Sequence, residues 1–314
     1  MNVRPYGWFE MQTPEISWKS WAMVAALGLT WGGTFLVTEI ALDGMTPYWL
    51  AAGRICFAVL VMLAIWPMMG GQLFEAPLTR PAAVSVVAIG GFSTAIPFML
   101  LAWGQQFVTS GFAGVSMASV GLLVLPLAHF LVPGERITKR RAIGFLIGFC
   151  GVCVLIGGQA FDSTGAELEW AGRIACVTAA CCYGVSSVLM RRLPAVDPIG
   201  LSTVLLIIAA GMTIPMALWQ EGLPTMPDTR TLIVIALLGL IPTAAANLLR
   251  VLVIRTAGPV FMSLTNYQVP VWSVVLGAWL LSEPLPPSLI WAMFLILIGV
   301  GLSQFGALKR LFFR

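Results

Sequence analysis

The stretch from Phe130 to Gly158 decides the fold and reads FLVPGERITKRRAIGFLIGFCGVCVLIGG. An apolar run ends at Pro133-Gly134, a charged turn with Glu135 and several Arg and Lys residues follows, and a second apolar run begins. Two apolar runs of membrane-spanning length that are joined by a basic turn are typical of a helical hairpin in a membrane.

A similar pattern recurs near the end of the chain. Leu281-Ser282-Glu283-Pro284 is followed by a short turn and then by an apolar run over residues 290–306. When the two stretches are aligned with small gaps, Glu135 falls on Glu283. We infer that the chain contains two copies of one unit, and that each copy ends in the same kind of hairpin.

The composition requires lipid as the solvent. The chain has 314 residues, of which 59% are apolar and only 10% are charged, whereas soluble domains carry about 25% charged residues. At about 20 residues for each span, this length allows roughly ten spans. Backbone polar groups in hydrocarbon must be satisfied internally, so the spans should be helices. We predict an all-α integral membrane protein with ten transmembrane helices at 18–42, 47–69, 82–107, 110–132, 139–158, 170–190, 198–219, 231–254, 258–281 and 286–307.

The distribution of Lys and Arg predicts the orientation of these spans. If the N-terminus is cytoplasmic, the only loop cations on the outer side are Arg173 and Arg230, which agrees with the excess of cations in cytoplasmic loops. Both termini then lie in the cytoplasm, and the protein is expected in the inner membrane. Because each unit has an odd number of spans, the second copy is inverted relative to the first. The expected parts are an N-terminal segment, two five-helix repeats and a basic tail, at 1–17, 18–158, 170–307 and 308–314.

Several motifs together resemble the EamA-type transporters of the drug/metabolite transporter superfamily. They are Trp31-Gly32 in the first span, Arg54 in the second, Gly134-Glu135-Arg136-Ile137 after the fourth and Ser282-Glu283-Pro284-Leu285 after the ninth. Within the superfamily the chain looks most like the YddG-type exporters of aromatic and other amino acids. The resemblance covers nearly the whole chain. It implies ten helices, alternating access and a central cavity lined mainly by spans 1, 3, 4, 6, 8 and 9.

Polar and aromatic residues at mid-depth are our candidates for substrate binding, because transporters built as inverted repeats place the site near the midplane. Asn266 and Gln268 should face the interior or a water-filled cavity, although such amides also join helices to one another. Trp31 and Tyr183 could stack on an aromatic substrate, with core packing as the alternative. The full set is Trp31, Thr34, Trp103, Ser119, Tyr183, Asn247, Asn266, Tyr267 and Gln268.

Arg54 is the one charge that lies clearly inside a span. A charge at this depth is functional by default and needs a partner. We expect a structural ion pair with Glu39, or failing that with Asp43, that braces the first two spans. A contact between Arg54 and the substrate is the alternative.

Two glycine pairs, Gly28-x-x-x-Gly32 and Gly144-x-x-x-Gly148, allow close approach of helices. The second pair could form a face between two copies of the chain, although packing within one subunit is the simpler expectation, so monomer and homodimer both stay open. Glu135 and Glu283 are expected to cap helices or to pair with cations.

The sequence favours no metal, cofactor or catalytic residue. Cys150-x-x-Cys153 has the spacing of metal ligands, but it has no second pair and no nearby His or carboxylate, so we interpret the cysteines as small hydrophobic residues. The single His and the small net charge of +4 do not suggest a nucleic-acid partner. An intramembrane enzyme needs a nucleophile–base pair or a metal cluster. An enzyme or a non-transporting scaffold is therefore the least favoured class.

The polar composition of the spans indicates the kind of cargo. No Asp or Glu lies at mid-depth in any span, and a proton relay normally needs one. We therefore predict a carrier that exports amino acids, neutral ones including the aromatic ones, or similar small metabolites, as a uniporter or with weak coupling. The alternative cargo is amphipathic drugs or quaternary amines, which Trp31, Tyr183 and Tyr267 could bind through cation–π contacts.

Overall fold

The computed structural model describes residues 16–68, 70–71, 73, 79–131, 137–157, 168–194, 196–257 and 259–312. In this part of the chain the regular elements are helices and no strand is present. Each of the ten segments expected from the sequence contains helix. The residues Pro133, Gly134, Glu135, Arg136 and Gly158 lie outside the described residues.

The first half of the chain forms five helical rods, two of which are interrupted. A π-helical segment, η1, interrupts the third rod, and the fourth rod breaks at Ser119. The π-helical segment ends just before Pro97, which has no N–H to donate to the preceding turn. The elements are α1 (Trp18–Leu42), α2 (Pro47–Met68), α3 (Arg80–Gly90), η1 (Gly91–Ala95), α4 (Ile96–Gly104), α5 (Ser110–Ala118), α6 (Val120–Leu131) and α7 (Lys139–Gly157).

The second half repeats this order of elements. Its third rod again contains a π-helical segment, η3, and here the proline, Pro242, lies inside it. The elements are α8 (Glu169–Arg191), α9 (Pro198–Glu221), α10 (Thr229–Leu238), η3 (Gly239–Ala245), α11 (Ala246–Ala257), α12 (Pro259–Met262), α13 (Thr265–Leu280) and α14 (Pro287–Phe312).

Eight of these rods are long and apolar enough to cross a membrane. The remaining two are α7, which begins with the cations Lys139, Arg140 and Arg141, and α13, which has 16 residues. The number of ten spans therefore stays a prediction.

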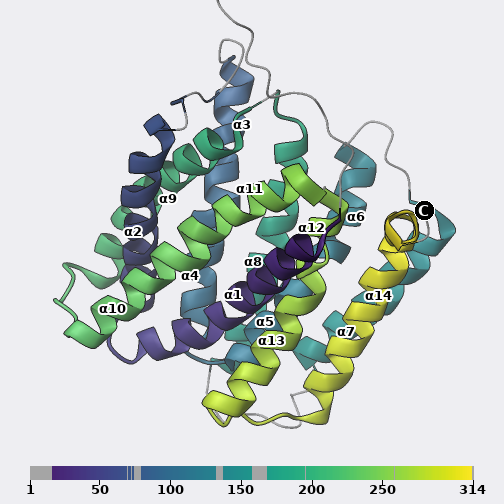
Figure 1. The fold of residues 1–314 in the computed structure, drawn as a ribbon. Helices are drawn as coiled ribbons and strands as arrows, with labels where there is room; N and C mark the ends of the chain where they lie inside the picture. The colour runs from purple at the N-terminus through teal and green to yellow at the C-terminus, as the bar shows by residue number, and fades with distance from the viewer. Residues whose placement is uncertain are drawn as a thin grey trace, which may run out of the picture.

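Helix packing has the same pattern in both halves. α2 packs against its counterpart α9, and α7 packs against its counterpart α14, as Figure 1 shows at opposite sides of the bundle. α1 contacts α13 and the rod formed by α10, η3 and α11. Its counterpart α8 contacts α5 and α6 and the rod formed by α3, η1 and α4. The two halves therefore contribute equivalent neighbours to each other.

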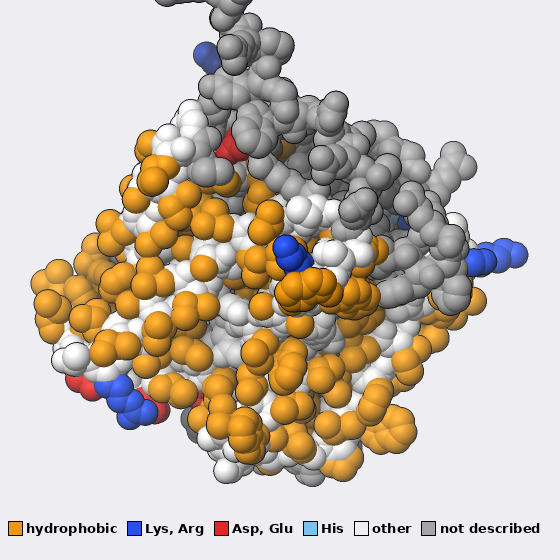
Figure 2. Space-filling model, in the orientation of Figure 1, with side chains coloured by type: hydrophobic (Ala, Val, Ile, Leu, Met, Phe, Trp, Pro, Cys, Tyr) orange, Lys and Arg blue, Asp and Glu red, His pale blue; other side chains and the backbone are white. Residues whose placement is uncertain are grey.

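The outer surface is apolar, as lipid contact requires. Figure 2 shows hydrophobic side chains over the flanks of the bundle. Large side chains there are widely exposed, among them Leu60 on α2, which a water-soluble monomer would not tolerate over so large an area. Six exposed tryptophans of the described residues lie near helix ends, where an aromatic belt is expected: Trp18, Trp21, Trp170, Trp219, Trp279 and Trp291.

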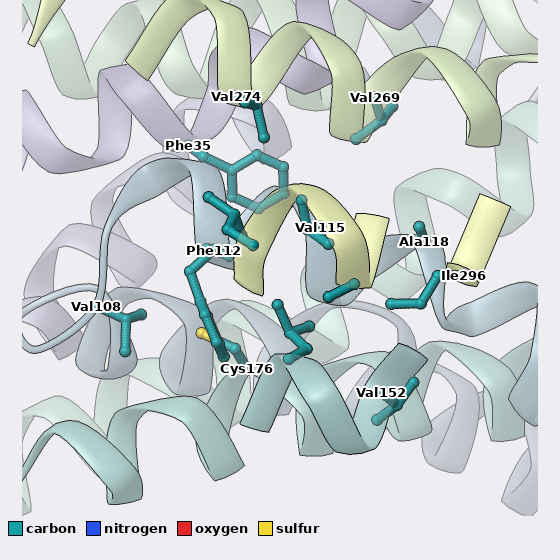
Figure 3. Close-up of a cluster of buried hydrophobic side chains, with 14 of the residues drawn as sticks. Phe35, Val108, Phe112, Val115, Ala118, Val152, Cys176, Val269, Val274 and Ile296 are labelled. Carbon is teal, nitrogen blue, oxygen red and sulfur yellow. The ribbon is translucent and has the colours of Figure 1, made fainter. Parts of the chain in front are cut away.

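The main core lies where α1, α5, α8, α13 and α14 meet. Figure 3 shows side chains from these helices converging on Phe112, which is fully buried. The start of α5 is held by Glu283, whose carboxylate accepts hydrogen bonds from the backbone N–H groups of Ser110 at 2.9 Å and Gly111 at 3.0 Å. The predicted capping role of Glu283 is thus confirmed, whereas Glu135 lies outside the described residues.

The glycines of α7 are used within one chain. A Cβ atom on Gly144 would lie 2.6 Å from the carbonyl oxygen of Gly299 on α14, and a Cβ atom on Gly148 would collide with Leu122. Only glycine permits this approach of the two helices. Packing within one subunit is therefore confirmed for these glycines, and they are not free to form a face between two copies.

Candidate functional site

A small cavity lies between α1, α2 and α4. It has room for about one water molecule. We call it the Arg54 cavity, because Arg54 is the charged residue in its wall. The lining residues are Thr34, Phe35, Thr38, Leu50, Ala51, Arg54, Phe98, Leu101, Ala102 and Gln105.

Arg54 is fixed in the wall of this cavity by two contacts. Its side chain is buried, and its Nε donates a hydrogen bond of 2.8 Å to Oγ1 of Thr243 in η3. The Thr243 hydroxyl itself donates to the carbonyl of Leu238 at 2.8 Å, so its lone pairs are directed at the arginine. The guanidinium carbon lies 4.1 Å from the centre of the Phe98 ring, within the range of a cation–π contact. Arg54 therefore joins the first half of the chain to the second.

Gln105, the residue that follows α4, also lines the cavity and is 2% exposed. Its Nε2 donates to the carbonyl of Phe35 at 2.9 Å and to a carboxylate oxygen of Glu39 at 3.4 Å. Its Oε1 is buried and has no hydrogen-bond partner among the described residues. Gln105 is absent from the candidates above, although the reasoning applied to Asn266 and Gln268, a buried amide in an apolar span, selects it equally.

The predicted partners Glu39 and Arg54 each contact other groups in this structure. Among the described residues, Arg54 bonds to Thr243 and Glu39 accepts from Gln105. The ion pair between them stays a prediction, and so does the alternative that Arg54 contacts substrate.

Four of the predicted site residues lie near Arg54 or contact η3. Thr34 lines the cavity. The indole N–H of Trp31 donates to the carbonyl of Pro242 at 3.1 Å, and Nδ2 of Asn247 donates to the carbonyl of Thr243 at 2.6 Å. Tyr183 of α8 lies within electrostatic range of Arg54. These residues come from α1, α8 and α11, so both halves of the chain contribute.

The α13 candidates lie elsewhere, and none of them lines the Arg54 cavity. Gln268 packs on α1, since a Cβ atom on Gly28 would lie 2.5 Å from its Oε1. Tyr267 packs against the main core, with its hydroxyl buried and without a hydrogen-bond partner among the described residues. Asn266, near the start of α13, is exposed. Substrate contact by these three residues stays a prediction.

Two further candidates, Ser119 and Trp103, also lie outside the cavity wall. Ser119 is fully buried and its hydroxyl donates to the carbonyl of Ser116, at the break between α5 and α6. Trp103 is half-buried and meets the edge of Phe107 with ring centres 5.0 Å apart. Their contact with substrate likewise stays a prediction.

The cysteines are unpaired, and they are spread over the bundle. Cys150 and Cys153 are exposed on α7, whereas Cys176 and Cys182 are buried. Within the described ranges, no three His, Cys, Asp or Glu side chains are grouped closely enough to hold a metal ion. Buried polar groups occur in several places, among them the ion pair between Arg173 and Glu169. The Arg54 cavity brings together a cation, hydroxyls and an amide, which can bind a polar solute.

Comparison with known proteins places both halves in one group. The sequence model of the EamA-like transporter family matches residues 17–157 and 170–304. The chain is 26% identical over 292 residues to the Uncharacterized inner membrane transporter YedA of Escherichia coli (strain K12), which covers 90% of this chain and 89% of that protein. It is 28% identical over 160 residues to Protein PagO of Salmonella typhimurium, about half of each chain.

One solved structure has a similar fold. It is titled "Crystal structure of protein" and matches with a TM-score of 0.64 over 92% of this chain and 98% of its own, at 22% identity. At this identity the match concerns the arrangement of the helices alone.

Proposed function

Because the chain belongs to the EamA-like transporter family, we propose that it is a multi-pass inner-membrane carrier that exports amino acids or similar small metabolites. The amino acids are neutral ones, including the aromatic ones. The carrier works by alternating access, as a uniporter or with weak coupling. The membrane assignment is supported by the eight apolar helices and by the name of its relative, an inner membrane transporter.

The proposed architecture is ten transmembrane helices in two inverted five-helix repeats, 18–158 and 170–307, with both termini in the cytoplasm. The equivalent packing of the two halves supports this repeat. A carrier built in this way opens to one side and then to the other by moving one repeat against the other around a fixed central site.

The observation that carries this proposal is the hydrogen bond between Arg54 and Thr243 beside a buried cavity. Arg54 belongs to the first half and Thr243 to the second, so the polar interior lies where the halves meet. The wall of the cavity comes from the first half, and Thr243 of the second half holds Arg54 in that wall. The binding free energy of a substrate on Arg54 could therefore differ between the two access states.

The residues of this proposed site are Trp31, Thr34, Tyr183 and Asn247, together with Arg54. Trp31 and Tyr183 supply aromatic surface for an apolar or aromatic side chain. The candidates Trp103, Ser119, Asn266, Tyr267 and Gln268 would contact substrate along the path or in another access state.

Counterflow of radiolabelled amino acids in proteoliposomes tests the function. The purified protein should exchange neutral amino acids with and without a pH gradient, because uniport needs no gradient. If no amino acid exchanges under either condition, the assignment is wrong. Movement of a quaternary amine in the same vesicles would then favour the alternative cargo.

A further inference from the structure

Among the described residues, the guanidinium of Arg54 forms no ion pair and has unused hydrogen-bonding capacity. Its flat face is covered by the Phe98 ring and its Nε is used by Thr243. Stacking occupies the face of a guanidinium and leaves the N–H groups at its edge available. In the described part of the chain, the terminal nitrogens Nη1 and Nη2 have no hydrogen-bond partner. A buried cation with free donors in a membrane interior has an unfavourable free energy unless it binds a partner.

Gln105, which lines the same cavity, offers the complementary group. Its amide orientation is fixed, because only the NH2 group can donate to both Phe35 and Glu39. The oxygen that is left over, Oε1, is a buried acceptor without a donor. Leaving such an atom unpaired is unfavourable. The cavity can therefore accept a donor at Gln105 as well as an anion at Arg54.

We propose that the Arg54 cavity binds the charged head of a zwitterionic α-amino acid, with the carboxylate on Nη1 and Nη2 of Arg54 and the ammonium group on Oε1 of Gln105. This inference rests on the proposed transport function and specifies the class of substrate. A guanidinium edge matches the two oxygens of a carboxylate, and a neutral amide oxygen accepts from an ammonium group.

The size of the cavity fits this role in a carrier that changes shape. It has room for about one water molecule, so the head of an amino acid enters only when the wall moves. The Arg54–Thr243 bond crosses between the halves of the chain, and separation of the halves would widen the space beside Arg54. The same cation repels a quaternary amine, so the cavity selects against the alternative cargo.

The wild-type protein alone can test the charge requirement. Competitors of labelled leucine counterflow would be leucine, leucinamide, which lacks the carboxylate, and N-acetyl-leucine, which lacks the ammonium group. Leucine should compete about 10- to 100-fold better than leucinamide, because a charge-assisted pair with Arg54 is lost. A smaller preference is expected over N-acetyl-leucine, because Gln105 is uncharged. Equal competition by leucine and leucinamide would overturn the inference while leaving amino-acid transport in place.

Variants then assign the preference to Arg54. Arg54→Met should lose the discrimination between leucine and leucinamide, whereas Arg230→Met, the same change at an exposed arginine on α10, should keep it. Arg54→Lys should retain part of the preference, because it keeps the charge without the fork of donors. If Arg54→Met does not fold, Gln105→Met provides the second test, with loss of the preference for leucine over N-acetyl-leucine as the expected result.

The outcomes separate this inference from the proposed function. No exchange of any amino acid by the wild type removes both. Exchange that is lost equally for leucine and leucinamide in Arg54→Met, with the folded protein present, gives Arg54 a structural role and overturns the inference. Exchange that continues in Arg54→Met with its leucine preference intact also overturns it.

Discussion

The Arg54 cavity and the contact between α1 and α13 both lie along α1, and both contain polar side chains. They differ in what those residues touch. In the cavity, donors of Arg54 and the oxygen of Gln105 border open space and lack partners among the described residues. At the other contact, Gln268 fills the space above Gly28, and Trp272 lies against Gly32.

The difference separates two uses of polar groups inside a membrane. A polar side chain set against a glycine holds two helices together, since the small residue allows close approach. A polar side chain with free donors beside a cavity has a binding capacity that the fold itself does not use. The chemistry of the residue is the same in both places, and only its surroundings tell the two uses apart.

The largest effect on stability is expected when a side chain is added at the contact between α1 and α13. Gly32→Ala places a Cβ atom 2.5 Å from Cβ of Trp272 and 2.9 Å from the carbonyl oxygen of Val269, and neither atom can move without its helix. Overpacking of this kind costs about 1–3 kcal/mol or more. We expect a large loss of folded protein by size-exclusion chromatography and a lower Tm. Gly33→Ala is the control, since its nearest neighbour is an ordinary contact at 3.4 Å; equal loss in both variants would contradict this account.

A smaller effect is expected when the hydrogen bond between Arg54 and Thr243 is removed. Thr243→Val keeps the shape of the side chain but leaves Nε of Arg54 without its acceptor. We expect a Tm decrease and amino-acid exchange weakened by about tenfold, because a buried donor is unpaired and Arg54 loses its support. Thr213→Val is the matched control, since its hydroxyl bonds only within its own helix, α9. Exchange equal to wild type in Thr243→Val would show that the bond does not position Arg54.

A third, weaker effect compares Gln268 at the α1–α13 contact with Gln105 in the Arg54 cavity. Gln268→Ala removes packing from Gly28 and should lower the Tm while leaving the leucine affinity within about threefold of wild type, since packing losses act on folding more than on binding. Gln105→Ala should weaken leucine exchange more than Gln268→Ala does. Counterflow titrations of the two variants would decide. The reverse order would make Gln268 the stronger substrate ligand and give Gln105 a structural role.

Helix positions follow from the sequence more closely than helix contacts do. The expected segments 198–219 and 47–69 correspond to α9 at Pro198–Glu221 and α2 at Pro47–Met68, because spans must be apolar and of bilayer length. The π-helical segments η1 and η3 are not predictable in this way, since hydropathy is unchanged when a helix widens. A π-helical turn changes the direction of the side chains within it and after it. Because Thr243 lies inside η3, the sequence does not show that it meets Arg54.

The smallest effect is expected outside the spans, at the start of α10, and it depends on pH. Asp228 caps this helix by accepting a hydrogen bond of 3.0 Å from the backbone N–H of Thr231. That hydrogen bonding, with a minor contribution from Arg230, lowers the pKa of Asp228 below its usual 3.8. A lowered pKa in the folded state means that the stabilisation is present at neutral pH and is lost as the pH falls through that pKa. Asp228→Asn keeps a capping oxygen that does not titrate, so wild type should exceed this variant in Tm at pH 7 and lose that advantage as the pH falls below 3.8. A difference in Tm that is constant with pH would show that the cap acts without its charge.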